Sequence, residues 1–275
     1  MIRLVVDAVG FGSSPQGNTP ILRAHRDGIV TSVSIAGNAG DLARAAEDIA
    51  QAPKLGVGLA LALLHGPPVA KPDSVTTLLA ADGRFRSHSR TFGLDWMRGR
   101  IAAAHVEAEF EAQIERAKSA GLVLDHLCTV GHLGFLPGVG QIVERLARRY
   151  QIAGIRTEVE TPTLSWMADP ARGLETGVLS ALAWLTRRRL GALGYGPKTW
   201  GYMESERLDE IRIMELLGRM GPGAHELICH PGTEAERGAD VRETHDDEIS
   251  ALTSPRLRSV LEERKIVLCR WRDLF

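Results

Sequence analysis

Cysteines are scarce in this chain of 275 residues, and it has no long hydrophobic run. The three cysteines, Cys128, Cys229 and Cys269, lie far apart, which argues against a disulfide framework and fits a reducing compartment. The longest apolar stretch, Val57 to Leu64, is too short to cross a bilayer. The segment 2–6 is too short for the hydrophobic core of a signal peptide, so we expect a cytoplasmic protein.

The chain also lacks an excess of charge of either sign. Its 33 basic and 34 acidic side chains give a formal net charge of −1, so neither nucleic acid nor an anionic membrane is an expected partner. The segment Phe11-Gly12-Ser13-Ser14 does not have the spacing of a dinucleotide or Walker loop. No pair of cysteines is spaced for zinc. These absences leave a small molecule as the expected ligand.

Short β-type segments alternate with helical ones along the chain. This alternation predicts a parallel sheet with helices outside it, and seven or eight such units favour a closed or nearly closed barrel. The expected strands are 3–6, 29–35, 57–63, 122–129, 152–158, 199–203, 225–229 and 266–270. The expected helices are 16–27, 41–52 with Asp41 as its cap, 101–119, 139–150, 173–190, 208–220 and 247–263 with a break at Pro255.

The stretch 66–100 interrupts this alternation. It carries three prolines and several glycines, which predicts a long excursion over the surface. No linker or internal repeat divides the chain, so we expect a single domain spanning 1–275.

Three polar residues near strand ends are candidates for the site, each with a second interpretation. Asp7 is a candidate base or else a turn carboxylate. Arg156 would bind an anionic or hydroxyl-rich substrate, or else form a salt bridge at the barrel rim. Cys128 lies beside histidines that would activate a nucleophilic thiol, although a small buried thiol is the commoner case.

Histidines near two strand ends are the other candidates. His132 would shuttle protons or contact substrate, or else be structural. His230 would act as a pocket acid or substrate donor, or else bind a neighbouring loop. Asp125 and His126 are neighbours on an expected strand and should face opposite sides, so we expect no dyad and a structural role for His126.

The whole chain resembles the YdjC-like carbohydrate deacetylases, the group that includes the ChbG and HpnK proteins. The resemblance rests on several segments taken together: Phe11-Gly12, residues 23–32, 55–59 and 66–69, His126-Leu127, His132, residues 136–139, 226–232 and 251–255. It implies an α/β fold, a distorted (β/α) barrel of the glycoside hydrolase and deacetylase type. It also implies removal of an N-acetyl group from an amino sugar, with a divalent metal polarising water and the carbonyl and a carboxylate taking the proton.

This sequence departs from the family pattern at the metal ligands and the base. Val9 and Gly10 stand where the family has two adjacent aspartates, and Ala60 stands where its third strand has a histidine. The family's Asp-Ser-His-Gln-His-x-His strand becomes Cys128-Thr129-Val130-Gly131-His132-Leu133-Gly134, in which His132 is retained. Val9, Gly10, Ala60 and Val130 offer no side-chain lone pairs to a divalent cation, so we expect no metal and no other cofactor.

Three hypotheses follow for function. The first is a repurposed, metal-independent enzyme that uses His132, His230 and Asp7 for acid–base chemistry on a small molecule in the barrel mouth. Its more apolar pocket would be lined by Arg156, Cys128, Val9, Ala60 and Val130, unless repacking closes the space. The second is a non-catalytic sugar-binding or regulatory protein. The third is a carbohydrate N-deacetylase with ligands from unexpected positions. A homo-oligomer is compatible with all three.

Overall fold

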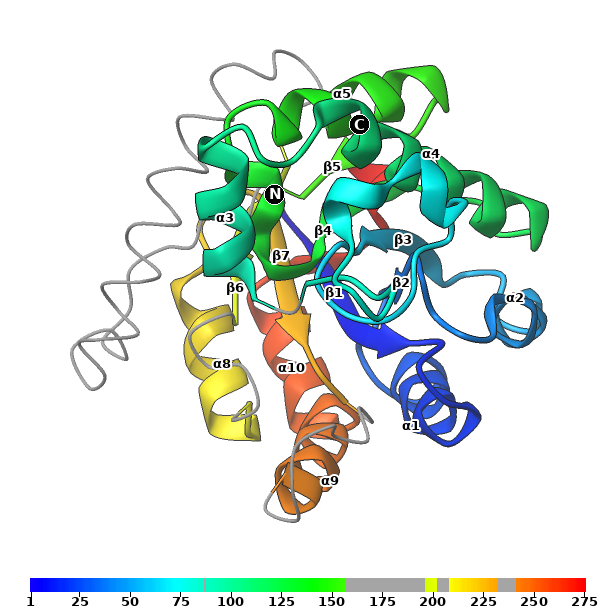
Figure 1. Cartoon of the computed structure of the whole chain (residues 1–275). Coiled ribbons are helices and arrows are strands. Elements are labelled where there is room, and N and C mark those ends of the chain that lie inside the picture. Colours follow the sequence, from blue (N-terminus) through cyan, green and yellow to red (C-terminus); the bar gives the residue numbers. More distant parts are fainter. Residues whose placement is uncertain (87, 157–195, 202–207, 232–240) are drawn as a thin grey trace.

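The computed structural model describes residues 1–86, 88–156, 196–201, 208–231 and 241–275 (Figure 1). The expected helix 173–190 and the outer ends of the expected strands 152–158 and 199–203 lie outside these ranges. None of the helices within them combines the length and the hydrophobicity needed to cross a membrane.

The strands form one parallel sheet in the order β5-β4-β3-β2-β1-β7-β6, and the last strand, β8, pairs with the first residues of β1. Figure 1 shows the sheet curled into a half-barrel with helices around its outer face. The expected distorted (β/α) barrel is therefore confirmed. The strands are β1 (Ile2–Phe11), β2 (Ser32–Ala36), β3 (Gly56–Leu61), β4 (His126–Thr129), β5 (Gly154–Ile155), β6 (Lys198–Trp200), β7 (Gly223–Cys229) and β8 (Ile266–Leu268).

The helices lie close to their expected positions. The break near Pro255 is confirmed, because Ser254 caps a new helix there, and Asp41 caps α2 by accepting from the Arg44 N–H at 3.0 Å. β4 begins four residues later than expected, because residues 122–125 connect α4 to the sheet. The helices are α1 (Pro15–Arg26), α2 (Leu42–Ala50), α3 (Ser89–Met97), α4 (Ala103–Ser119), α5 (Val139–Arg149), α8 (Glu210–Arg219), α9 (Val241–Leu252) and α10 (Pro255–Glu263).

Alternation along β1 separates two apolar regions. Leu4, Val6 and Ala8 belong to the main core shared with the helices, whereas Val5 packs with Trp271 in a smaller cluster. Because successive strand residues face opposite sides, Asp7 faces the same side as Val5. The 3₁₀ turn Trp271–Leu274 thus places an indole beside the inward face of β1, and Asp7 points into that interior.

The excursion 66–100 contains two 3₁₀ turns and α3, and it is fastened to α4 by a buried carboxylate. Glu109 accepts hydrogen bonds from the backbone N–H groups of Val69 at 2.9 Å and Ala70 at 3.0 Å. Gln113 donates to the same carboxylate at 2.7 Å, and its amide also binds both backbone groups of Ala62, just after β3. One face of α4 thereby fixes the start of the excursion beside the end of β3.

We expect Glu109→Ala to lower the free energy of unfolding by about 1–3 kcal/mol, because two partly buried N–H groups lose their acceptor. Amide hydrogen exchange at Val69 and Ala70 should accelerate in parallel. Glu107→Ala is the matched control on the same helix: its exposed ion pair with Arg145 should contribute less than about 1 kcal/mol. Equal losses in the two variants would contradict this account of the anchor.

Candidate functional site

A buried arginine lies between two buried carboxylates inside the curled sheet. Arg156 follows β5, Asp7 lies on β1 and Glu226 lies on β7. The Arg156 Nη2 atom is 2.6 Å from Asp7 Oδ2 and 2.7 Å from Glu226 Oε1, and Nε is 3.0–3.1 Å from both Glu226 oxygens. One guanidinium therefore holds two carboxylates from neighbouring strands.

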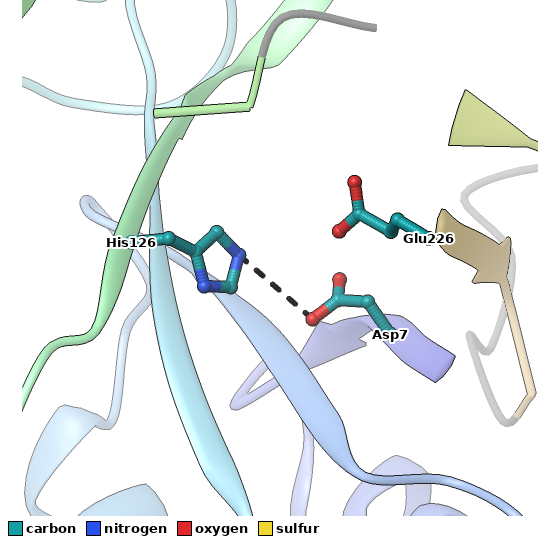
Figure 2. A group of neighbouring side chains, drawn as sticks. All are labelled: Asp7, His126 and Glu226. Carbon is teal, nitrogen blue, oxygen red and sulfur yellow. Dashed lines mark ion pairs between the residues drawn. The ribbon is translucent and has the colours of Figure 1, made fainter. Parts of the chain in front are cut away.

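His126 reaches the same cluster from β4, on the other side of the interior (Figure 2). Its Nε2 atom lies 3.3 Å from Ser34 Oγ and 3.9 Å from Asp7 Oδ1, and its Nδ1 atom lies 2.8 Å from Asp125 Oδ1. The expectation that Asp125 and His126 form no pair is wrong. Asp125 precedes the first residue of β4, so strand alternation does not direct its side chain away from the ring.

Packing holds the His126 ring in place. The ring stacks on the Trp271 indole at 4.5 Å with 13° between the planes, and the indole N–H donates to Glu226 Oε1 at 2.9 Å. On the neighbouring strand, Gly58 leaves room for the ring, since a Cβ there would lie 2.1 Å from its Cε1 atom. The C-terminal turn and a glycine in β3 therefore orient the imidazole and a carboxylate together.

Ser34 joins Arg156 to Asp7 through its hydroxyl group. The hydroxyl donates to Asp7 Oδ2 at 2.8 Å and accepts from Arg156 Nη2 at 3.2 Å. Ser34, His126 and Asp125 superficially form a serine–histidine–aspartate series. An ionised carboxylate can only accept a hydrogen bond, however, so the Ser34 O–H is directed to Asp7 and not to His126. This arrangement does not prepare Ser34 as a nucleophile.

Asp7, Arg156 and Glu226 form an ion network, and the pKa values of Asp7 and Arg156 favour their charged forms. Burial alone would raise the pKa of Asp7, but the Arg156 guanidinium, the His126 ring and the Ser34 hydroxyl together hold it below the ordinary value of 3.8. Burial would lower the pKa of Arg156, but Glu226 and Asp7 raise it well above its usual range. Asp7 and Arg156 therefore remain ionised across the neutral range.

The residues present do not fit a divalent cation as they are arranged. In the part of the chain that the structure describes, Asp7, His126 and Glu226 offer ligand atoms that all lie within 4.8 Å of one another (Figure 2). Arg156 nevertheless makes short contacts with both carboxylates, and its positive charge would repel a metal ion bound between them.

Small side chains follow the charged network toward the carboxyl ends of the strands. Ala36, Ala60 and Cys128 are in register across β2, β3 and β4, two residues beyond Ser34, Gly58 and His126 respectively. Ala60 and Cys128 are buried, whereas Val9 and Val130 are half-buried. The predicted lining residues Val9, Ala60, Cys128 and Val130 thus belong to β1, β3, β4 and the turn after β4.

The two candidate histidines follow the carboxyl ends of β4 and β7. His132 has a φ of +60° directly after Gly131 at +67°, and its ring stacks on Phe135 at 5.9 Å. A left-handed conformation is uncommon for a residue other than glycine and is often kept at functional sites. His230 is half-buried, and its backbone N–H donates to Glu248 Oε1 at 2.9 Å. Their catalytic roles stay predictions.

The sequence analysis did not identify Ser34, Glu226 and Trp271 as site residues. Glu226 could have been predicted, because it lies in the segment 226–232 that resembles the family. Nothing in the sequence indicates that Ser34 or Trp271 lies beside Glu226. Arg156, one of the predicted substrate-binding residues, is buried in the ion network. Its Nη1 atom makes no hydrogen bond with any residue that the structure describes.

The fold and the inward-facing polar network define an α/β-barrel protein with a buried ion network in its interior. Residues 3–263 match the YdjC-like protein family, and the chain belongs to this family. The resemblance that the sequence motifs indicate is therefore confirmed.

Its relatives include proteins named carbohydrate deacetylase. The one from Geobacillus stearothermophilus is 28% identical over 276 residues, covering 98% of this chain and 97% of the relative. The one from Halalkalibacterium halodurans is 32% identical over 230 residues, with 84% and 85% covered. A crystal structure of a putative cellobiose-phosphate cleavage protein from Enterococcus faecalis has a TM-score of 0.74 at 22% identity, covering 99% of this chain and 98% of that one, and shares the fold.

Gly58→Ala should lower the free energy of unfolding by about 1–3 kcal/mol, because the added methyl group would overlap a ring already fixed by stacking and by Asp125. The exposed helical Gly218, which has open space around its Cβ position, is the control, and Gly218→Ala should raise stability by up to about 1 kcal/mol. Urea unfolding measures both variants. A Gly58→Ala protein as stable as wild type would show that the His126 ring can move.

The contribution of Asp7 to stability should depend on pH in one direction. The pKa of Asp7 in the folded protein lies below its unfolded value. Its stabilising effect is therefore present above about pH 4 and is lost as the pH falls through the folded pKa. At pH 7 the Asp7→Asn protein should be less stable by about 3–5 kcal/mol, since Arg156 loses a buried partner. Unfolding curves from pH 7 to pH 2 should show this difference shrinking only at the acid end. A constant difference would contradict the ion-pair explanation.

Proposed function

We propose that this YdjC-family protein binds a small hydroxyl-rich molecule at the carboxyl ends of its strands and transforms it by proton transfer, without the divalent cation that the family resemblance implies. The observation that carries this proposal is the position of Arg156. Its guanidinium lies between Asp7 and Glu226, the two carboxylates of the described group that could ligate a metal. Val9, Gly10, Ala60 and Val130 supply no replacement ligands.

Within this proposal, His132 and His230 are the acid–base groups. Both follow strand ends and are half-buried, so they combine access to a ligand with a fixed position. Proton-transfer reactions such as elimination, isomerisation or cyclisation need an acid and a base but not a metal. Asp7 also stands among the predicted acid–base residues, but its short contact with Arg156 and its lowered pKa favour a role in holding the guanidinium.

Three further observations support a small, polar ligand. The relatives' names point to carbohydrates. The row Ala36, Ala60 and Cys128 presents small side chains just beyond the charged network. Arg156 Nη1 has no protein acceptor among the described residues, so it can donate to a hydroxyl or carbonyl oxygen of the ligand. The balanced net charge of the chain supports such a ligand over nucleic acid, and we keep the cytoplasm as the proposed location.

Metal-dependent carbohydrate deacetylation is the second candidate function. The relatives' names and the Asp7, His126 and Glu226 group favour it, although Arg156 would first have to leave the two carboxylates. A non-catalytic sugar-binding or regulatory role is the remaining alternative. It differs from the other two in predicting no turnover of any substrate.

The test combines metal analysis with two assays on purified protein. We expect less than stoichiometric Zn, Mn and Mg by elemental analysis, and no acetate from N-acetylated chito-oligosaccharides with or without added metal. We also expect N-acetylglucosamine or diacetylchitobiose in D₂O to gain deuterium at the carbon next to the reducing aldehyde, followed by ¹H NMR. His132→Ala and His230→Ala should each slow this exchange at least tenfold, since general acid–base catalysis typically contributes ~10²–10⁴-fold.

The exposed His88 provides the control, and His88→Ala should exchange at the wild-type rate. Stoichiometric metal together with acetate release would establish deacetylation instead. Calorimetric binding of diacetylchitobiose without any exchange would favour the sugar-binding alternative.

A further inference from the structure

We propose that Asp7, His126 and Glu226 form a latent metal site in which the guanidinium of Arg156 is the resident cation. The proposal concerns the interior of the half-barrel and does not rest on the proposed reaction. It assigns Arg156 the electrostatic task that a divalent ion performs in a three-ligand site.

Asp7, His126 and Glu226 carry the types of ligand atom found in metal centres, and these atoms converge on one point. They come from β1, β4 and β7 and converge from different sides of the interior (Figure 2). One imidazole nitrogen and two carboxylate oxygens lie within 4.8 Å of one another. In a tetrahedral zinc site with bonds of about 2.1 Å, ligand atoms are about 3.4 Å apart, so shifts of an ångström or so would complete the coordination.

Each of the three side chains is already oriented by a further hydrogen bond. His126 Nδ1 contacts Asp125 Oδ1 at 2.8 Å, which leaves Nε2 facing the carboxylates. Ser34 donates to Asp7 Oδ2, and Trp271 donates to Glu226 Oε1. Metal-binding histidines and carboxylates are typically fixed by outer partners of these kinds.

One ligand oxygen accepts no hydrogen bond from any residue that the structure describes. Asp7 Oδ1 is buried with no described hydrogen-bond donor, although the nearby Ser32 hydroxyl helps to lower the pKa of Asp7, and Oδ1 lies 3.9 Å from His126 Nε2. A buried carboxylate oxygen is usually hydrogen-bonded or bound to a cation, because leaving it unpaired is costly. This oxygen and the imidazole nitrogen therefore mark an incompletely satisfied position inside the cluster.

Arg156 explains why the cluster does not need a metal. Its Nη2 atom contacts both carboxylates at 2.6 and 2.7 Å, and a guanidinium stays protonated at any pH that a folded protein tolerates. The positive charge between Asp7 and Glu226 is therefore present whether or not a metal ion is available. Removing the guanidinium would leave two buried carboxylates and an imidazole without a compensating cation, which favours uptake of a divalent ion.

The experiment titrates Co²⁺ into wild type and Arg156→Ala and follows the visible d–d absorption, with Zn²⁺ competition. Arg156→Ala should bind one Co²⁺ per chain at least 100-fold more tightly than wild type, with bands of a four- or five-coordinate ion. Adding His126→Gln to Arg156→Ala should weaken binding at least tenfold. Arg156→Lys, which keeps a cation, should resemble wild type. Arg145→Ala, which breaks a surface ion pair with Glu107, controls for the loss of one positive charge.

The proposal would be overturned by a folded Arg156→Ala protein that binds no Co²⁺, or by Co²⁺ binding that His126→Gln does not affect. Wild type showing the same Co²⁺ spectrum would overturn it as well. If Arg156→Ala does not fold in the presence of a chelator, Zn²⁺ should restore its folding, as followed by circular dichroism. If Zn²⁺ does not restore folding although Arg156→Lys folds, the proposal is also contradicted. Metal-free turnover by wild type is measured separately, so this proposal and the proposed function can fail independently.

Discussion

The contact of one guanidinium with two carboxylates organises the interior of this protein. Asp7 lies on β1, Glu226 lies on β7 and Arg156 directly follows β5, and all three are buried, so none of the charges is tolerable without the others. Ser34 and Trp271 each donate a hydrogen bond to a carboxylate of this network. His126 stacks on Trp271 and lies 3.9 Å from Asp7, so the positions of all three residues make sense only around the network. The C-terminal turn is part of the same arrangement, since it delivers Trp271.

Membership of the YdjC-like family and the chemistry of this site point in different directions. The chain keeps the family's scaffold across residues 3–263, and its relatives are named carbohydrate deacetylases. Its strand ends carry Val9, Gly10, Ala60 and Val130, none of which can ligate a metal. Asp7 and Glu226, which could do so, are bridged by an arginine. A permanent cation can hold carboxylates and donate hydrogen bonds, but it cannot lower the pKa of a bound water as a metal does. This difference is why we propose proton-transfer chemistry.

Much of the fold could be predicted from the sequence because its signals are local. The cap Asp41, the helix break at Pro255 and the expected helix 101–119 depend on neighbours within a few residues, and each is found close to where expected. The strand ends were harder, because apolar residues before His126 continue the β-type pattern through a connection. The same uncertainty produced the error at Asp125, whose side chain was assigned to a strand that begins one residue later.

The sequence alone predicts the alternating order of strands and helices, the family, and the absence of metal-ligating side chains at four positions near three strand ends. These follow from residue identity and short-range periodicity. The folded structure was needed to show that Asp7 bonds to an arginine 149 residues away and that Ser34 accepts a hydrogen bond from the same guanidinium. It was also needed to show that Trp271 stacks on His126 and donates to Glu226. Such contacts depend on strand register and on the curl of the sheet, and neither is encoded in the spacing of residues along the chain.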